Sequence, residues 1–309
     1  MTFIPASRFN AYTGNPLDRG SNLREDTAFL AAAQQRGDAR VSPIWRARSL
    51  MRGAGDGRPE AVFLTGAEAA SLHALGKPSA FLGRYDDGVP VFTVDLSDVE
   101  DPLPLLPGGI GEFTDLRAVP GLLRPEDAAI LAHARGLMHW RSRHRFCGVC
   151  GAACEPKQAG HVMGCTGCGA QHFPRTDPAV IMLVTTGDRA LLGHSQRFPN
   201  SRMYSTLAGF VEPGESLEEA VAREVFEESG VRVGAVHYHS SQPWPFPASI
   251  MLGFYAEALT EEITIDPNEI SDARWFTRDQ MRHCADHDFL LPRSDSIASR
   301  LIDDWIAAG

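Results

Sequence analysis

Glutamate side chains are concentrated in one short segment of the 309-residue chain, residues 209–231, which reads GFVEPGESLEEAVAREVFEESGV. Glu224, Glu227 and Glu228 are three and four positions apart, so a helix would place all three on one face. Like charges at this spacing repel, whereas a solvated helix face usually alternates them with Lys or Arg. A rigid edge of carboxylates suits Mg²⁺ or Mn²⁺, which take oxygen ligands and bind together with substrate phosphates. Arg223 is expected to balance part of the charge and to orient a neighbouring carboxylate.

Cysteines form a second cluster, because five of the six lie within residues 147–168. Two C-x2-C pairs are present, Cys147 with Cys150 and Cys165 with Cys168. Two tight turns that each carry two thiolates match the tetrahedral coordination of a structural Zn²⁺, and the glycine after each pair would let backbone N–H groups approach the sulfurs. Cys154, His161 and His172 are competing ligands or bystanders, and redox or unrelated thiols are the alternative to a zinc ribbon.

A proline-rich segment, residues 241–249 (SQPWPFPAS), follows the glutamate segment. It is interpreted either as a stiff loop packed on its domain, as a polyproline II ligand for another protein, or as a recognition loop. In the last case Trp244 and Phe246 would stack on a base or a nicotinamide ring, and Gln242 and the serines would hydrogen-bond its polar edges. The prolines would hold these side chains ready for a flat ligand at low entropic cost.

A helix over residues 216–229 is predicted to position the carboxylates. Ser216 and Glu219 form a capping-box pattern after the turn at Pro213 and Gly214, and Gly230 is typical of a helix C-terminus. The helix would pack on a core through an apolar stripe formed by Leu217, Ala220, Val221 and Val225.

Other elements follow from short apolar runs and helical spacing. Strands are predicted at residues 61–64, 80–82, 89–94, 180–184, 190–192, 250–255 and 273–276, and further helices at 126–144, after Pro125, and at 294–307. Residues 101–109 are predicted to be a loop or linker. Strands that alternate with helices and loops indicate a layered α/β or α+β protein.

The length suggests about two domains of the usual ~100–200 residues, and 43% hydrophobic residues suffice for a substantial core. The formal net charge of −10 argues against a general electrostatic grip on nucleic acid or on anionic membranes. No apolar run approaches the roughly 20 residues of a membrane span, and the N-terminus does not resemble a secretory signal, so a cytoplasmic location without membrane contact is expected. The predicted parts are an N-terminal domain (1–144), a zinc ribbon (145–173) and a C-terminal domain (174–309).

The glutamate segment resembles the Nudix box of the Nudix hydrolase family. The matching positions are Gly209, Glu215, Arg223, Glu224, Val225, Glu227, Glu228, Gly230 and Val231. The resemblance implies an α+β fold in which a Nudix-type α/β/α sandwich follows the small zinc ribbon and an N-terminal α/β domain. It also implies a hydrolase of nucleoside diphosphate derivatives, with Glu224 and Glu228 as ligands of a catalytic Mg²⁺ or Mn²⁺ and Glu227 as a further ligand or the general base.

The segment 241–249 is similar to a motif of the NADH pyrophosphatase (NudC-type) subgroup, which also has a four-cysteine ribbon before its Nudix domain. This resemblance implies cleavage of NADH and NAD⁺ to nicotinamide mononucleotide and AMP, removal of NAD caps from RNA as a further activity, and a homodimer. It implies two more metal ligands, the carbonyl of Ala208 and the carboxylate of Glu269. It places substrate contacts at Phe173, Gln242, Pro243, Trp244, Pro245, Phe246, Pro247, Ala248, Ser249 and Ala298.

Two other readings stay open. One is a Nudix hydrolase for ADP-ribose, coenzyme A, dinucleoside polyphosphates or oxidised nucleotides. The other is a nucleic-acid- or protein-binding module with a zinc ribbon and a degenerate Nudix domain. The complete set of Glu224, Glu227 and Glu228 argues against degeneracy, because a binding module has no need to keep carboxylates that repel one another.

Overall fold

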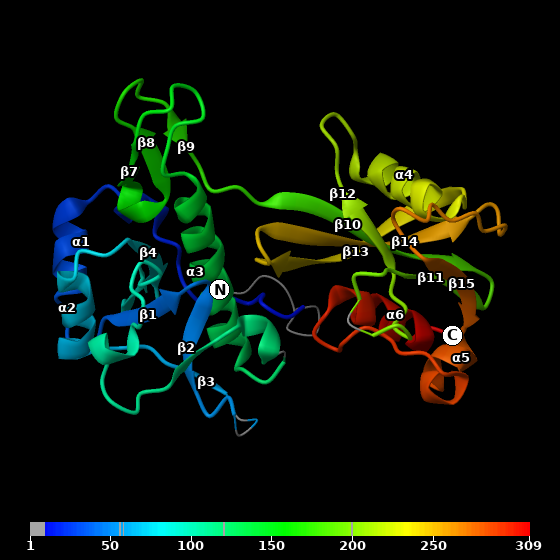
Figure 1. The fold of residues 1–309 in the computed structure, drawn as a ribbon, viewed down its shortest axis with the longest axis horizontal. Coiled ribbons are helices and arrows are strands. Elements are labelled where there is room, and N and C mark those ends of the chain that lie inside the picture. Colours follow the sequence, from blue (N-terminus) through cyan, green and yellow to red (C-terminus); the bar gives the residue numbers. More distant parts are fainter. Residues whose placement is uncertain (1–9, 56, 58, 120, 199) are drawn as a thin grey trace. The chain divides into compact units, whose positions relative to one another are not determined.

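The computed structural model describes residues 10–309 except 56, 58, 120 and 199. The chain divides into two compact units (Figure 1). Unit 1 comprises Met1–Thr176 together with Trp244–Ala248, and unit 2 comprises Asp177–Pro243 together with Ser249–Gly309. The bounds predicted for a separate ribbon, residues 145 and 173, stay a prediction. In the described part of the chain, no helix is both long enough and apolar enough to cross a membrane.

Unit 1 is built on a six-stranded mixed sheet of order β3-β2-β1-β5-β4, with β6 paired to β2. Its strands are β1 (Arg40–Trp45), β2 (Arg48–Arg52), β3 (Glu60–Ala61), β4 (Ser79–Arg84), β5 (Pro90–Asp95) and β6 (Glu112–Thr114). Its helices are α1 (Thr27–Gln34), α2 (Gly66–Ala74) and α3 (Pro125–Arg143), with short 3-10 turns η2 (Ser21–Leu23), η3 (Leu103–Leu105) and η4 (Leu116–Ala118).

The two faces of this sheet carry different helices, because neighbouring strand residues point to opposite faces. Phe81 and Phe92 pack with Leu72 of α2 in one core. Leu82 packs with Ile130 of α3 in another. Unit 1 is therefore a three-layer structure in which α3, the helix predicted after Pro125, covers one face of the sheet and α1 and α2 cover the other.

A small three-stranded sheet of order β7-β8-β9 carries the cysteine cluster within unit 1. Its strands are β7 (Cys154–Lys157), β8 (Val162–Cys165) and β9 (Gln171–His172), with the turn η5 (Gln158–Gly160) between the first two. The strands pair antiparallel, and Cys154 lies opposite Cys165.

Unit 2 is an α/β/α sandwich around a six-stranded sheet of order β13-β14-β10-β11-β15, with β12 paired to β10. Its strands are β10 (Asp177–Thr186), β11 (Arg189–His194), β12 (Leu207–Phe210), β13 (Val233–Trp244), β14 (Ser249–Ala258) and β15 (Asp272–Thr277). Its helices are α4 (Leu217–Ser229), α5 (Arg278–Arg282) and α6 (Ile297–Ala307), with the turn η6 (Cys284–His287). The predicted α+β class and the α/β/α sandwich are confirmed.

Strand β10 shows why the sandwich forms, because its buried residues serve the two faces in turn. Val180 and Met182 pack with Val225 of α4 in one core. Ile181 and Leu183 pack with α6 in the other. An apolar strand with both faces covered is expected at the centre of such a sheet.

Helix α4 has the predicted caps. The Ser216 hydroxyl accepts a hydrogen bond from the N–H of Glu219, and the Glu219 carboxylate accepts one from the N–H of Ser216. At the other end Gly230 has φ 71°, a left-handed conformation that favours glycine. Local sequence therefore fixes both ends of the helix that carries the carboxylates.

Three elements differ from their predictions. The last helix begins at Ile297 rather than at residue 294, because Ser296 is its N-cap and accepts a hydrogen bond from the Ser299 N–H. The strand predicted at residues 61–64 is reduced to β3, which ends at Ala61. Residues 241–244, predicted as part of a loop, continue strand β13 as far as Trp244.

Candidate active site

The carboxylates of α4 lie against strand β12, which immediately precedes the α4 segment and pairs antiparallel with β10. The close approach depends on Gly209. A Cβ atom at this position would lie 1.9 Å from Cδ of Glu224 and 2.0 Å from its Oε2. Only a residue without a side chain leaves room for the Glu224 carboxylate, which gives the first glycine of the segment a structural reason.

Arg223 connects the acidic side chains of the segment. Its Nε and Nη2 donate to the two carboxylate oxygens of Glu215 at 2.5 and 2.9 Å. Its Nη1 donates to both Glu224 and Glu227 at 2.8 Å, and its Nη2 also donates to the carbonyl of Phe210 at 2.9 Å. The hydrogen bonds from Arg223 lower the pKa of Glu215 to about 2. One planar guanidinium thus orients the carboxylates and ties α4 to β12, as predicted for Arg223.

Glu228 is buried, with 9% of its surface exposed. Its carboxylate accepts a hydrogen bond from the N–H of Ala208, but its Oε2 has no hydrogen-bond partner among the described residues. Burial and the negative charges of Glu224 and Glu269 raise the pKa of Glu228 to about 8. A buried oxygen without a partner is rare and asks for an explanation. A cation would supply one.

The other two carboxylates predicted as metal ligands lie near Glu228. Glu224 is buried, and its burial raises its pKa against the opposing effect of Arg223. Glu269 is exposed on the turn after Asp266, yet its charge raises the pKa of both Glu224 and Glu228. These hard oxygen donors, one of them unsatisfied, fit Mg²⁺ or Mn²⁺.

Glu227 is more accessible than its neighbours, with 47% of its side chain exposed, and Arg223 holds it in place. A carboxylate that is both oriented and open to solvent has the properties of a general base or of an outer ligand. The described residues contain one group of three or more ligating side chains whose atoms lie within 4.8 Å of one another, and that group is the cysteine cluster. The carboxylates are spaced more widely.

Phe210 is a feature of the site that sequence reasoning missed. It ends β12, its carbonyl accepts the hydrogen bond from Arg223, and 60% of its surface is exposed. An exposed aromatic ring can stack on a flat ligand. Its position in the sequence could have indicated it, because Phe210 directly follows Gly209, the glycine whose place allows no side chain.

The proline-rich segment is shared between the two units. Gln242 is fully buried in unit 2, where its amide donates to the Asp295 carbonyl at 2.7 Å and accepts from the Ile297 N–H at 2.8 Å. Ala298 is buried in the same core as α6. The side chains of Gln242 and Ala298 therefore stabilise unit 2, and substrate contacts at Pro243, Ser249 and these two residues stay predictions.

Residues 244–248 belong to unit 1, and the partly buried Trp244 and Phe246 pack against one of its cores. The rings of Trp244 and Phe246 contact Tyr12 edge to face, with centroids 6.2 and 5.7 Å away. Arg135 donates from Nε to the Pro245 carbonyl at 2.8 Å and lies 4.8 Å from the Phe246 ring centroid. These contacts give the segment the packing role of a stiff loop.

Substrate contacts by Trp244, Pro245, Phe246, Pro247 and Ala248 stay predictions. The same holds for Phe173, another aromatic residue of unit 1, which exposes 60% of its surface.

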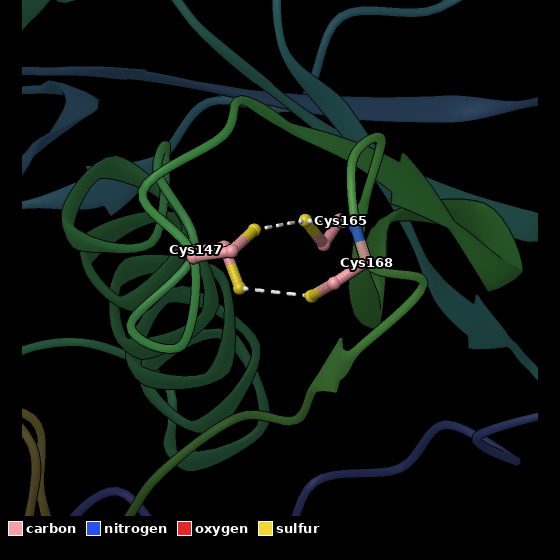
Figure 2. A group of neighbouring side chains, drawn as sticks. Cys147, Cys165 and Cys168 are labelled. Carbon is pink, nitrogen blue, oxygen red and sulfur yellow. Dashed lines mark hydrogen bonds between the residues drawn. The ribbon is translucent and has the colours of Figure 1, made fainter.

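Four thiols of the cysteine cluster point toward one another (Figure 2). The sulfurs of Cys147 and Cys168 are 3.7 Å apart, and those of Cys150 and Cys165 are 3.4 Å apart. Hydrogen bonds from the N–H groups of Cys150 and Val149 lower the pKa of Cys147, which favours the thiolate form that binds metal. Two C-x2-C turns with this convergence have the donor set of a structural zinc site.

The glycines after the two pairs serve the turns rather than the sulfurs. Gly151 and Gly169 both have φ 76°, which other residues rarely adopt, and the Gly151 N–H donates to the Cys147 carbonyl at 2.9 Å. The N–H groups that approach sulfur belong to other residues of the turns, namely Val149, Cys150, Gly167, Cys168 and Ala170.

The candidate competing ligands lie outside the four-thiol group. His161 is buried, and its Nε2 hydrogen-bonds to the Phe81 carbonyl at 2.7 Å. His172 hydrogen-bonds to Cys147 as a neighbour of the site. Cys154 lies on β7, opposite Cys165.

The fold is an α/β/α sandwich. Beside its sheet an arginine binds a row of glutamates, and a glycine allows one of these glutamates to approach the backbone closely. This is the architecture of a Nudix hydrolase. Sequence profiles of three domain families agree. They match a NUDIX domain at residues 175–296, an NADH pyrophosphatase-like rudimentary NUDIX domain at 38–140, and an NADH pyrophosphatase zinc ribbon domain at 142–173.

The chain is 44% identical over 226 residues to the NAD-capped RNA hydrolase NudC of Stutzerimonas stutzeri, covering 73% of this chain and 76% of that protein. It is 37% identical over 309 residues to the NAD-capped RNA hydrolase NudC of Mycobacterium bovis, covering 94% and 92%. It is 45% identical over 198 residues to the NAD-capped RNA hydrolase NUDT12 of Macaca fascicularis, covering 60% of this chain and 43% of that protein. The chain belongs to the NADH pyrophosphatase (NudC-type) family of Nudix hydrolases.

Proposed function

We propose that the protein hydrolyses the diphosphate of NADH and NAD⁺ to nicotinamide mononucleotide and AMP, and that it also removes NAD caps from RNA. The observation that carries the proposal is the buried Glu228 carboxylate, with an unsatisfied oxygen, beside Glu224 and the Arg223 network. The names of the relatives support the choice of an NAD-derived substrate.

Glu224, Glu228 and Glu269, with the Ala208 carbonyl, would hold a divalent cation, Mg²⁺ or Mn²⁺. When bound, such a cation neutralises the phosphate charge that repels the nucleophile and lowers the pKa of the attacking water. The protein contributes by holding these oxygens rigidly. Glu228 is held in place by burial and by the hydrogen bond from the Ala208 N–H. Glu224 is held by the hydrogen bond from Arg223, and its carboxylate fits into the space that the missing side chain of Gly209 leaves.

Glu227 is the carboxylate best suited to accept a proton from the attacking water. Arg223 orients its Oε2 from 2.8 Å, and nearly half of its side chain is open to solvent. Positioning and electrostatics supply most of the catalysis of diphosphate cleavage. An oriented carboxylate and neutralised phosphates would therefore account for most of the rate acceleration.

Recognition of the nucleotide would use exposed aromatic surface. Phe210, whose residue surface is 60% exposed, is the stacking candidate within unit 2. Phe173 is the candidate within unit 1. Segment 244–248 would contribute by shape, because its two large rings are held by Tyr12 and Arg135.

The four-cysteine ribbon would hold a structural Zn²⁺, since four thiols close a tetrahedral site and leave no position for catalysis. A homodimer and a cytoplasmic location complete the proposal. Sedimentation analysis of the purified protein tests the first, and fractionation of the source cells tests the second.

The decisive experiment incubates the purified protein with NADH, NAD⁺, ADP-ribose and an NAD-capped RNA, each with Mg²⁺, with Mn²⁺ or with EDTA. Products are identified by mass. We expect AMP and reduced nicotinamide mononucleotide from NADH, metal-dependent cleavage of NAD⁺ and of the capped RNA, and no products in EDTA.

Faster cleavage of ADP-ribose than of any NAD derivative would keep the Nudix chemistry and refute the proposed substrate. No cleavage of any compound would favour the binding-module alternative. Glu218→Gln serves as the matched control in this assay, because Glu218 is an exposed glutamate on the same helix, outside the Arg223 network.

A further inference from the structure

Cys154 is a fifth cysteine of the ribbon, and nothing described so far uses it. It begins β7, is partly buried, and packs against the core that contains Met163 of β8. It lies outside the group of four converging thiols. Its cross-strand neighbour is Cys165, which is one of those four.

The backbone hydrogen bonds define how closely these two residues approach. The Cys154 N–H donates to the Arg145 carbonyl at 2.9 Å, and the Thr166 N–H donates to the Ala153 carbonyl at 3.0 Å. Cys154 and Cys165 therefore form a non-hydrogen-bonded antiparallel pair, in which the Cα atoms are about 4.5 Å apart and the side chains share one face.

This geometry fits a disulfide bond, because bridged cysteines have Cα separations of about 4.4–6.8 Å and Cβ separations of about 3.5–4.5 Å. We propose that Cys154 is an oxidation site that forms a cross-strand disulfide with Cys165 and thereby releases zinc from the ribbon. The inference rests on the structural zinc proposed above, but not on the hydrolytic activity.

The step needs a two-electron oxidant such as hydrogen peroxide. Peroxide oxidises one sulfur to a sulfenic acid, and the other sulfur displaces the oxygen as water and forms the S–S bond. In sum, the Cys154 thiol, the Cys165 thiolate, one peroxide and one proton give the disulfide and two waters. The two sulfurs lose two electrons and the peroxide gains them.

Loss of Cys165 is damaging for the metal site. Its sulfur accepts N–H hydrogen bonds from Gly167 and Cys168 at 3.3 and 3.4 Å, so it is the most strongly oriented thiolate of the second pair. A disulfide sulfur is no longer an anionic ligand, and three thiolates leave the tetrahedral site open.

Two other disulfides compete, between Cys150 and Cys165 and between Cys147 and Cys168. In both, each sulfur would be a zinc ligand, and its lone pair would be occupied in the loaded ribbon. Cys154 is the ribbon thiol without that protection.

The test treats the full-length, zinc-loaded protein with hydrogen peroxide at neutral pH. A colorimetric chelator follows zinc release, and mass spectrometry of a non-reduced digest maps the disulfides. The variants are Cys154→Ser, which removes the proposed partner but none of the four ligands, and Cys284→Ser, which removes the cysteine outside the ribbon. Zinc content before oxidation shows whether each protein starts with a loaded ribbon.

We expect a Cys154–Cys165 disulfide in the wild-type protein, zinc release at least fivefold slower in Cys154→Ser, wild-type release in Cys284→Ser, and recovery of zinc binding after reduction. Wild-type release from Cys154→Ser, or a map dominated by disulfides between two of the four ligands, would overturn the proposal. The wild-type map decides the matter even if Cys154→Ser folds poorly. A preparation without zinc would count against the zinc proposal instead, and the map would still report on Cys154.

Discussion

The cysteine ribbon of unit 1 and the carboxylate edge of unit 2 both gather groups that repel one another when charged, but they do so differently. The ribbon uses short turns, whose own N–H groups stabilise the sulfurs of Cys147 and Cys165. The carboxylate edge uses burial of Glu228 and a guanidinium from the same helix. Local turns form a metal site that stabilises the fold. Packing of a helix on a sheet can instead keep a carboxylate buried with an oxygen that has no partner, which leaves this oxygen ready to bind a ligand.

The contrast is largest at Glu228. Glu228→Gln removes the buried carboxylate charge while it keeps the shape, so we expect cleavage of NADH to fall at least about a thousandfold, roughly 4 kcal/mol on the barrier. Stability should be unchanged or higher, because the repulsion of this carboxylate by the charges of Glu224 and Glu269 is removed. Steady-state kinetics and urea unfolding measure the two effects, and Glu218→Gln should behave as wild type. If Glu228→Gln kept wild-type activity, Glu228 would not be part of the active site.

The opposite pattern is expected in the ribbon. Cys147→Ser should abolish zinc binding and lower the free energy of unfolding of unit 1 by about 3 kcal/mol or more, because metal binding contributes directly to folding. Atomic absorption and urea unfolding are the measurements, and Cys284→Ser is the control outside the ribbon. A zinc-free variant as stable as the parent would mean that the ribbon metal has no structural role.

A smaller effect is expected where packing sets the position of a carboxylate. Gly209→Ala would place a Cβ 1.9 Å from Cδ of Glu224, so β12 and α4 must move apart. We expect a loss of about 1–3 kcal/mol in stability and of about 10–100-fold in kcat. Gly37→Ala is the control, since no atom lies within 4 Å of the added Cβ. Equal effects of the two substitutions would show that the close approach at Gly209 is unimportant.

The smallest effect concerns the pH dependence of unit 1. Burial lowers the pKa of His161 to about 4, the Phe81 carbonyl opposes this, and Arg24, Arg19 and Arg141 add to it. Between about pH 6.5 and 4 the unfolded chain binds a proton that the folded chain does not, so the free energy of unfolding falls as the pH falls. His161 should cost about 1 kcal/mol between pH 7 and 5.5.

Urea unfolding at both pH values checks this, with His161→Gln as the variant that cannot titrate at this position. The buried His133 acts in the same direction, because burial lowers its pKa as well. His161→Gln should therefore reduce the pH dependence without removing it. An unchanged dependence would show that the His161 ring is solvated in the native protein.

Sequence reasoning worked where the determinants are local. The capping box at Ser216, the stop at Gly230 and the two C-x2-C pairs are each encoded within a few residues, and the structure has all of them. Arg223 was also predicted to orient a carboxylate, because its position beside Glu224 is fixed by the helix.

It failed where a role depends on which element packs against which. The packing role of Gln242 was not foreseen, because only the sheet order brings its amide to the N-terminus of α6, where backbone groups bond to both ends. Its substrate contact stays a prediction. Strand β1 was missed because Pro43 and charged flanks hide a strand that is buried through α3 on one face and through α1 and α2 on the other. Phe210 was missed because its exposure is a property of the folded edge.

The excursion of residues 244–248 has a consequence for how the protein can be divided. The chain leaves unit 2 after Pro243, packs Trp244 and Phe246 against a core of unit 1, and returns at Ser249. Three covalent crossings therefore join the units, after Thr176, Pro243 and Ala248. A hydrolase domain excised at residue 177 would carry two large rings without their core, and the remaining fragment would lack them. A single cut between the units therefore damages both of them.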